Sequence, residues 1–227
     1  MRESSARGQY HATTVQTQYR RRKFQFQAFY TAAYNFSDDD NERDTGFNTT
    51  SGYQDAFNFR QDYGYAAIDI RHQFTANSTY SLPFGIELGG IFRGRTGLPI
   101  NARVGTDANG DGVNSDRPYQ GPGQIFARNY FRNRGTTQLD MRVMKSFTFH
   151  DRIKAQISME LFNLLNADNV VFGANALIYG EGYGATGAVP IDARFMRLRN
   201  PANGNYDRNN VQVGSPLQAQ FGARVFF

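Results

Sequence analysis

Apolar and polar residues alternate along several stretches of the chain, and the clearest stretch runs from Ile153 to Leu161. Every second residue there is apolar, and the residues between them are charged or polar. Successive side chains of a β-strand point to opposite faces, so this two-residue period predicts a strand with one apolar face. A similar stretch from Gln138 to Phe149 precedes it, and the short segment between the two predicts a tight hairpin.

The same alternation recurs elsewhere in the chain and predicts about seven long strands in all. The further stretches lie at about residues 11–21, 23–36, 66–82, 86–95 and 217–227. They extend over about 10–15 residues, whereas strands of soluble sheets usually have about 5–6 and a tilted membrane strand needs about 9–11. Their length therefore favours strands that cross a bilayer.

The connections between these strands alternate between short and long. Short connections lie near residues 21–23, 83–85 and 149–152, and long ones span about 37–65, 97–137 and 163–213. In an up-and-down sheet alternate connections emerge on the same side, and outer-membrane barrels have short periplasmic turns and long extracellular loops. We therefore predict that residues 1–227 form an all-β, antiparallel up-and-down transmembrane β-barrel segment.

The last stretch ends on an apolar strand face and a terminal aromatic residue. This ending resembles the C-terminal assembly signal of outer-membrane proteins, carried here by Gln220, Gly222, Val225 and Phe227. The resemblance implies a location in the outer membrane of a Gram-negative-type bacterium. It also implies two partners, the lipid of that membrane and the barrel assembly machinery.

Composition excludes several other classes of protein. The hydrophobic share is 40% and the mean hydropathy is −0.59, and no stretch approaches the ~20 apolar residues of a membrane helix. The absence of cysteine excludes disulfides, thiol catalysis and cysteine-based zinc sites. The net charge of +5 is scattered apart from Arg20–Lys23, so we expect no nucleic-acid partner. The first residues lack a signal peptide's apolar segment, so we expect the natural chain to begin upstream of Met1.

Short motifs along most of the chain resemble the C-terminal barrel region of TonB-dependent receptors, in particular Oar-like outer-membrane proteins. The most specific motif runs from Glu160 to Asn166 and resembles the signature of the family's penultimate strand. The other motifs are Arg71–Phe74, Leu82–Gly85, Gly94–Pro99, Asp107–Gly112 followed by Asp116–Pro118, and Leu139–Arg142 with Lys145–Phe147.

The resemblance implies a larger receptor, with a periplasmic N-terminal region, a plug domain and a barrel of about 22 strands. This chain would supply the last strands of that barrel. Its partners would be the missing N-terminal strands and plug, and a TonB-type energy-coupling protein that acts through the missing region. The intact receptor would bind and import a scarce solute.

Two alternatives to a transporter stay open at this point. One is an Oar-like structural or adhesive outer-membrane protein without transport. The other is a small soluble ligand-binding barrel, whose interior would be apolar.

One long loop carries the first half of a calcium-binding motif. Asp107, Asn109 and Asp111 place oxygen ligands at alternate positions ahead of a glycine, and Asp116 would add a carboxylate. Pro118 occupies the position of the closing glutamate, so an EF-hand is excluded. A polar, turn-forming loop explains the same residues. Calcium in the 107–116 loop is a hypothesis, and we expect no other cofactor.

Charged residues on the polar strand faces are the candidates for lining the barrel lumen. There they would contact the plug or bias solute passage, or they would only solvate a wet interior. These residues are Arg71, Arg93, Arg95, Arg142, Lys154, Glu160 and Arg224. Lys145 falls on the opposite, lipid-facing side, where only a position near an interface lets its ammonium reach water.

Nothing in the sequence indicates catalysis. His11, His72 and His150 are isolated, with no nucleophile motif or zinc-ligand spacing beside them. We therefore expect no enzymatic activity.

Overall fold

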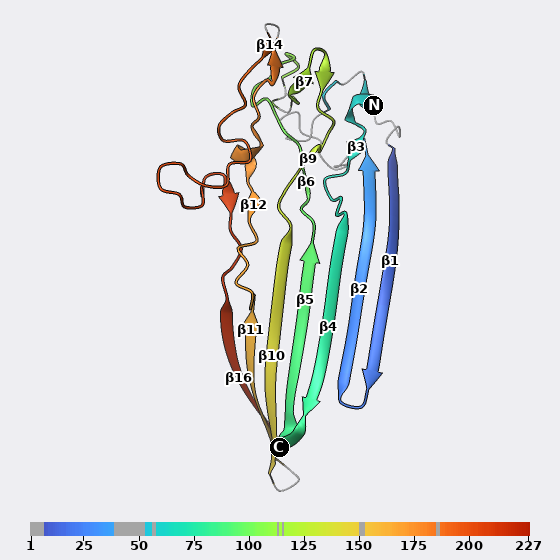
Figure 1. Cartoon of the computed structure of the whole chain (residues 1–227), viewed down its shortest axis with the longest axis vertical. Coiled ribbons are helices and arrows are strands. Elements are labelled where there is room, and N and C mark those ends of the chain that lie inside the picture. Colours follow the sequence, from blue (N-terminus) through green and yellow to red (C-terminus); the bar gives the residue numbers. More distant parts are fainter. Residues whose placement is uncertain are drawn as a thin grey trace.

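Figure 1 shows the computed structural model of the chain, which describes residues 7–38, 53–55, 58–112, 114, 116–149, 153–184 and 187–227. Within these ranges the secondary structure is β-strand with short 3₁₀ helices and no α-helix. No helix in the described part is long and apolar enough to cross a membrane. The predicted all-β class is confirmed.

The long strands form one antiparallel up-and-down sheet. Each strand pairs with the next long strand along the chain, in the order β1-β2-β4-β5-β10-β11-β16. The long strands are β1 (Gly8–Arg21), β2 (Phe24–Ser37), β4 (His72–Leu82), β5 (Ile86–Arg95), β10 (Thr136–Phe149), β11 (Ile153–Phe162) and β16 (Gln218–Phe226).

The remaining elements are short and lie mostly in the long connections. The short strands are β3 (Gly64–Tyr65), β6 (Pro99–Ile100), β7 (Tyr119–Gly121), β8 (Gln124–Ile125), β9 (Phe131–Arg132), β12 (Val171–Phe172), β13 (Tyr183–Gly184), β14 (Gly187–Ala188) and β15 (Val211–Gln212). The 3₁₀ helices are η1 (Phe59–Asp62), η2 (Pro83–Gly85) and η3 (Ala174–Leu177).

The pairing of the long strands keeps their apolar positions on one side of the sheet and their polar positions on the other. Ala28 lies opposite Ala76 on β4, and Ala76 lies opposite Phe92 on β5, so apolar positions face the same side on neighbouring strands. We call this side the apolar face: it carries the even-numbered residues of β2, β4 and β5 and the odd-numbered residues of β1, β10, β11 and β16. The remaining strand residues form the polar face.

No described side chain of the apolar face is buried: those of β1 and β16 are exposed, and those of the strands between them are half-buried or exposed. Val15 is 58%, Ile157 51% and Phe221 76% exposed, which a soluble sheet would bury against a second layer. A continuous apolar surface of this kind marks contact with another apolar medium.

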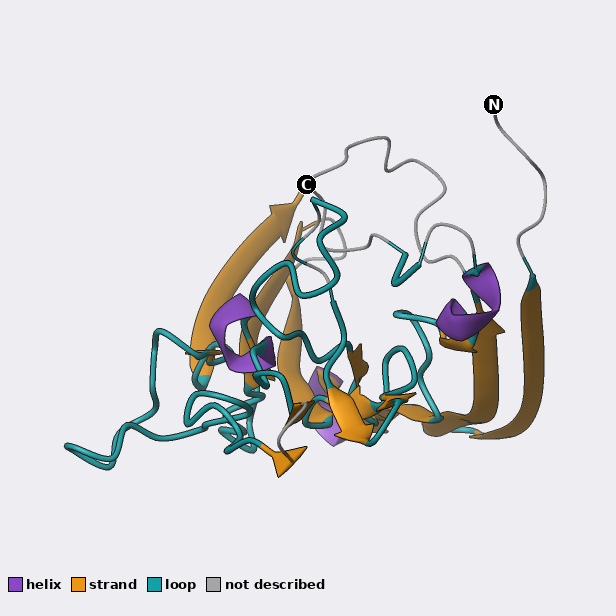
Figure 2. Ribbon diagram, turned by 90° about the horizontal axis from the view of Figure 1, so that it is seen from above, coloured by secondary structure: helices purple, strands orange, loops and turns teal. Residues whose placement is uncertain are grey.

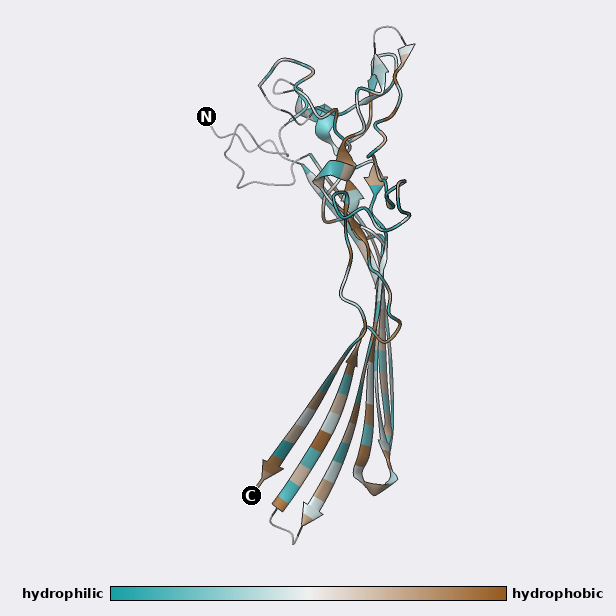
Figure 3. Ribbon diagram, turned by 90° about the vertical axis from the view of Figure 1, so that its left-hand side faces the viewer, coloured by the Kyte–Doolittle hydropathy of each residue, from teal (hydrophilic) through white to brown (hydrophobic). Residues whose placement is uncertain are grey.

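The sheet follows an open arc, with β1 at one end and β16 at the other (Figure 2). The described short turns, at residues 21–23 and 83–85, lie at one end of the strands, and the described parts of the long connections lie at the other (Figures 1 and 3). This segregation agrees with the predicted alternation of short and long connections. Parts of the predicted connections lie outside the described residues: 39–52 and 56–57 of the first loop, 113 and 115 of the second, 185–186 of the third, and 150–152 of the last short turn.

The apolar core of the described chain lies in the long connections and not in the sheet. We call the described residues of 53–71, 96–135 and 163–217 the loop layer. The loop layer contains nearly all the buried aliphatic side chains of the described residues, and the sheet contributes only Ala33. Those of the loop layer are Ala66, Ile100, Ala102, Val104, Val170, Ala176 and Val211.

Aromatic rings join two of the long connections within this layer. Phe131 of β9 lies 4.9 Å from Phe195 and 5.8 Å from Tyr179, measured between ring centroids. Phe126 lies 5.2 Å from Phe131 and 5.4 Å from Tyr179. Offset and edge-on aromatic pairs at these separations are attractive, so the cluster ties residues 96–135 to residues 163–217.

One predicted strand begins later than the alternation indicated. A strand was expected from Ala66, but β4 starts at His72. The amide of Asp69 instead donates to the carbonyl of Ala66 at 2.9 Å, and the Asp69 carboxylate accepts from the amide of Asn35 at 2.7 Å. The apolar residues of this stretch had mimicked a strand, and Ile68 is 73% exposed.

Gly97 marks a close backbone approach that tests this packing. A Cβ atom at Gly97 would lie 1.8 Å from the carbonyl oxygen of Asn133, so Gly97→Ala must force the two loop segments apart. We expect the thermal midpoint of the protein in detergent micelles to fall by several degrees, equivalent to at least about 2 kcal/mol.

The matched control is Gly121→Ala, whose Cβ would approach only the side-chain oxygen of Gln124, at 3.9 Å. That variant should melt within about 2 °C of the wild type. Equal midpoints for both variants would contradict the close approach at Gly97.

Candidate functional site

The polar face of the sheet gathers most of the charged residues predicted to line a lumen. Pairing across β5, β10, β11 and β16 places them on the same side of the sheet. The residues on this face are Arg93, Arg95, Arg142, Lys154, Glu160 and Arg224. Whether this side is a lumen stays a prediction.

Several of these residues pair across neighbouring strands. Nε of Arg142 lies 3.3 Å from Oε1 of Glu160 on β11, and Nη1 of Arg93 lies 3.1 Å from Oδ2 of Asp140 on β10. Both arginine side chains are about half exposed, with accessibilities of 48% and 52%. Exposed ion pairs contribute only about 0–1 kcal/mol, so these charges shape the electrostatics of the wall more than its stability.

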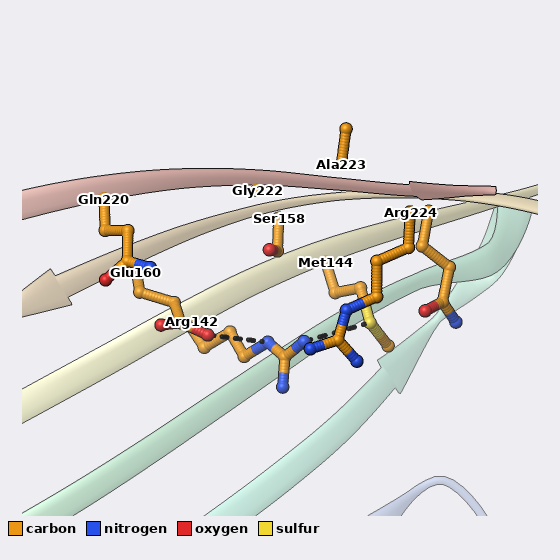
Figure 4. A pocket seen from close by; sticks show the side chains of 9 residues that line it. Arg142, Met144, Ser158, Glu160, Gln220, Gly222, Ala223 and Arg224 are labelled. Atoms are coloured by element: carbon orange, nitrogen blue, oxygen red, sulfur yellow. Dashed lines mark hydrogen bonds and ion pairs between the residues drawn. The ribbon is translucent and has the colours of Figure 1, made fainter.

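A small cavity of about 170 Å³ opens on the polar face between β10, β11 and β16 (Figure 4). In Figure 4 the side chains of Arg142, Glu160 and Arg224 extend to one side of the sheet, and Ala223 points to the other. The polar residues lining the cavity are Arg142, Gln156, Ser158, Glu160, Gln220 and Arg224. A guanidinium-lined hollow of this size has room for a few waters or a small anionic group.

The residues of the predicted assembly signal divide between the two faces. Gln220 and Gly222 lie on the polar face, opposite Glu160 and Ser158 of β11. Val225 lies on the apolar face, and Phe227 follows the end of β16 with its side chain fully exposed. Their role in assembly stays a prediction.

Arg71 is separate from the other charged residues. It precedes β4, so strand alternation does not determine its direction. Its guanidinium lies 4.5 Å above the ring of Tyr34, which is on the apolar face, and 4.2 Å above the ring of Tyr65. The structure therefore places Arg71 at the edge of the apolar face, where the loop layer begins.

Asp69 binds both Arg71 and Arg132 and is completely buried. Nε of Arg71 lies 3.0 Å from the Asp69 carboxylate, and Arg132 bonds the same oxygen from β9. Arg132 also donates to the carbonyl of Gly97 at 3.2 Å. This ion-pair cluster connects β2, the start of β4 and the loop that follows β5.

A second buried cluster joins Asp62 and Arg117. Their side chains are 5% and 3% exposed and lie 2.9 Å apart. The side chain of Gln54 accepts from the Arg117 amide at 2.8 Å and donates to Asp116 at 3.0 Å. Burial raises the pKa of the Asp62 carboxyl, which the Arg117 guanidinium opposes, and burial lowers the pKa of Arg117.

The predicted calcium-loop residues lie together, with their oxygens already bonded to the chain. Both carboxylate oxygens of Asp107 accept backbone amides, from Gly110 at 2.7 Å and Gly112 at 2.8 Å. Asn109 bonds Asp111, and the carboxylate of Asp116 accepts the amide of Asn109 at 3.1 Å. Among described residues, no three carboxylate or imidazole side chains are arranged to hold a metal ion. Calcium binding stays an untested hypothesis.

Asparagines with positive φ close the end of β11, a role that the sequence motif did not reveal. Asn163 has φ 52° and is 5% exposed. Its side chain donates to the carbonyls of Ala167 and Ser215 at 2.9 and 2.8 Å, and its amide donates to Asp140 at 2.9 Å. Asparagine tolerates the left-handed conformation and bonds its own backbone neighbours, so the Glu160–Asn166 motif is the joint between the sheet and the loop layer.

Lys145 lies on the apolar face, where the sequence analysis could accommodate its charge only near a membrane interface. Its ammonium donates to the carbonyl of Phe84 in the short β4–β5 turn and lies 5.3 Å from the ring centre of Phe147. The charge is therefore at the turn end of the sheet and away from its middle.

A larger hollow, the outer cavity, lies at the tip of the loop layer, where Figure 1 places β7 and β14. Its volume is about 690 Å³. The backbones of residues 119 and 181 bond directly, with the Tyr119 amide donating to the Glu181 carbonyl at 3.0 Å. The lining residues are Val104, Thr106, Asp107, Ala108, Tyr119, Pro122, Gly123, Glu181, Tyr183 and Gly184. Aromatic rings beside carboxylates suit a solute with both apolar and hydrogen-bonding groups.

Replacing Asn163 separates its two contributions, the backbone conformation and the side-chain bonds. Asn163→Ala loses both, and we expect it to destabilise the protein by about 3 kcal/mol. Asn163→Gly keeps the left-handed conformation and should cost about 1 kcal/mol less. Thermal midpoints in micelles would measure both, and a larger loss with glycine than with alanine would contradict this role.

Arg117→Gln leaves the buried Asp62 carboxylate without its cation. The folded-state pKa of Asp62 then rises further above its unfolded value, so the ionised form costs about 3 kcal/mol, and acidification relieves that cost. Protease cleavage of the loop layer should therefore be faster than in the wild type at about pH 8, with a smaller difference at about pH 5.

The control for this pH effect is the double variant Asp62→Asn with Arg117→Gln, which has no carboxylate to titrate. The cleavage rate of the single variant relative to this double variant should therefore fall between pH 8 and pH 5. A ratio of the two rates that stays the same at both pH values would show that Asp62 is not the group responsible.

Comparisons with known proteins agree with an outer-membrane location. A sequence model of the family described as "Outer membrane beta barrel domain" matches residues 1–196. No curated protein and no solved structure matches the chain.

Proposed function

Because this chain belongs to the outer membrane beta barrel domain family, we propose that it is the C-terminal barrel portion of a TonB-dependent receptor that binds and imports a scarce solute. Family membership itself makes the chain part of an outer-membrane β-barrel. The exposed apolar face then meets lipid, which accounts for side chains such as Val15 and Phe221 without a second layer.

The observation that carries the proposal is a folded loop layer above one end of a charged, polar-walled sheet. Short loops that only closed the strands would not need the aromatic cluster or the buried ion pairs described above. Rigidly held loops around a cavity are what solute recognition at the cell surface requires.

The polar face supports passage of the solute after binding. Arg142, Glu160 and Arg224 line it with polar groups, as the interior of a large outer-membrane barrel requires. The outer edges of β1 and β16 have no partner strand within the described part of the chain. We propose that further strands pair with these edges and that a plug fills the lumen.

Energy coupling would act on that plug through a TonB-type protein, as the sequence motifs imply. An Oar-like adhesive protein would share the barrel but would not depend on such coupling. Growth and surface attachment of a strain that lacks the gene distinguish the transporter from the adhesive protein.

The decisive measurement is growth of a strain that lacks the gene. It should grow more slowly than its parent when one required nutrient is scarce and at the parental rate when that nutrient is plentiful. Inactivating the energy-coupling protein should produce the same defect, with no further loss in the double mutant. Loss of surface attachment without any growth defect would favour the adhesive protein instead.

Two loop variants connect this phenotype to the structure. Tyr183→Arg places a bulky cation in the outer cavity and should fail to restore growth. Ile191→Arg, at an exposed position of the same loop that does not line the cavity, should restore it. Equal behaviour of the two variants, with both present at the cell surface, would argue against recognition in the outer cavity.

A further inference from the structure

A shallow groove lies on the apolar face of the sheet, where β4 and β5 meet the loop layer. We call it the rim groove, and its volume is about 490 Å³. It is separate from the outer cavity and from the cavity on the polar face. Its lining residues are Tyr30, His72, Phe74, Gly94, Arg95, Thr96, Gly97, Arg132, Asn133 and Gly135.

Glycines form the floor of the rim groove. Gly94 lies in one cross-strand row with Tyr30 and Phe74, so two aromatic side chains stand beside a position that has none. Gly97 and Gly135 continue the floor, and a Cβ at either position would lie 1.8 or 2.8 Å from a backbone oxygen. No side chain of the floor therefore fills the groove, and the rings of Tyr30 and Phe74 stand beside it.

The end of the rim groove beside the loop layer, where Arg132 lines it, is cationic. Arg71 and Arg132 share the single carboxylate of Asp69, which leaves one positive charge in excess. Asp69 is fully buried, whereas the arginine side chains keep 22% and 25% of their exposure. Beside them, the hydroxyl of Tyr30 bonds Nδ1 of His72 at 2.8 Å.

We propose that the rim groove binds one membrane lipid with a phosphate-bearing head group. An acyl chain would lie along the glycine floor between the aromatic side chains, and the phosphate would meet the exposed edge of Arg132 beside Arg71. The groove is continuous with the lipid-contacting face, so its occupant arrives from the bilayer. Guanidinium groups at a membrane interface match phosphate in both charge and geometry.

This proposal rests on the membrane-spanning orientation of the sheet and is independent of any transported solute. A lipid bound here would connect the sheet to the loop layer, because Arg132 and Asn133 belong to the loop that follows β5. If the growth experiment showed no solute import, the lipid proposal would still stand. If no lipid bound, the proposed solute import would still stand.

Native mass spectrometry of the protein, extracted from its membrane and kept in detergent micelles, would test the proposal. We expect phosphatidylglycerol to bind and diacylglycerol with the same acyl chains to bind at least about tenfold more weakly. Inorganic phosphate at the same concentration should not displace the lipid, because it gains nothing from the apolar floor. These comparisons need no variant.

Gly94→Leu fills the groove and should weaken phosphatidylglycerol binding about tenfold. Its Cβ would lie 3.3 Å from the edge of the Phe92 ring, which can shift slightly. The matched control is Gly90→Leu, on the same face of β5 but outside the groove, where a Cβ would lie 3.6 Å from the Ser78 hydroxyl. The control should bind the lipid as the wild type does.

Three results would overturn the proposal. Equal binding of diacylglycerol would show that the head group is not recognised. Displacement by inorganic phosphate would show a simple anion site instead of a lipid site. Unchanged binding in Gly94→Leu would show that the lipid lies elsewhere on the apolar face.

Discussion

Backbone hydrogen bonding between neighbouring strands, in one continuous register, is the constraint from which the other features of this structure follow. Hydrocarbon offers no partners for amide and carbonyl groups, so a membrane sheet must satisfy them internally. The constant register keeps Ala28, Ala76 and Phe92 on one side across three strands. A one-residue slip in any strand would turn charges such as Arg142 toward lipid. Lys145 is tolerated because it bonds the carbonyl of Phe84 at the turn end.

Because the sheet buries almost none of its side chains, the compact part of the described chain lies in its loops. Apolar residues such as Ala176 and Val211 are buried there, and rings such as Phe131 join loops distant in sequence. Buried ion pairs such as Asp62–Arg117 also fix how the loops pack, because separating them would leave a buried charge without a partner. The loop layer thus has what a recognition surface needs, a fixed shape around a hollow. The rim groove lies where the same layer meets the lipid-facing side.

Much of the sheet was predictable from the sequence, and much less of the candidate site was. Alternation correctly assigned Arg93, Arg142 and Glu160 to one face, because a strand's side chains follow from its backbone geometry alone. It misplaced the start of β4, because the turn at Asp69 depends on bonds to Asn35 and Arg132. No local signal indicated that Asp69 would be buried with two arginines. The Glu160–Asn166 motif indicated a special position, but not that Asn163 joins the sheet to the loops.

The sequence by itself determined the strands, their order and the face to which each side chain belongs. These properties depend on neighbours one or two residues away, and the two-residue period records them directly. Only the tertiary structure decided the rest: the contact between the two large loops, the buried ion pairs, the outer cavity and the rim groove. Those features depend on residues such as Gly97 and Asn133, which are distant along the chain but touch in the fold. Contacts of that kind follow no period, so the order of residues alone does not reveal them.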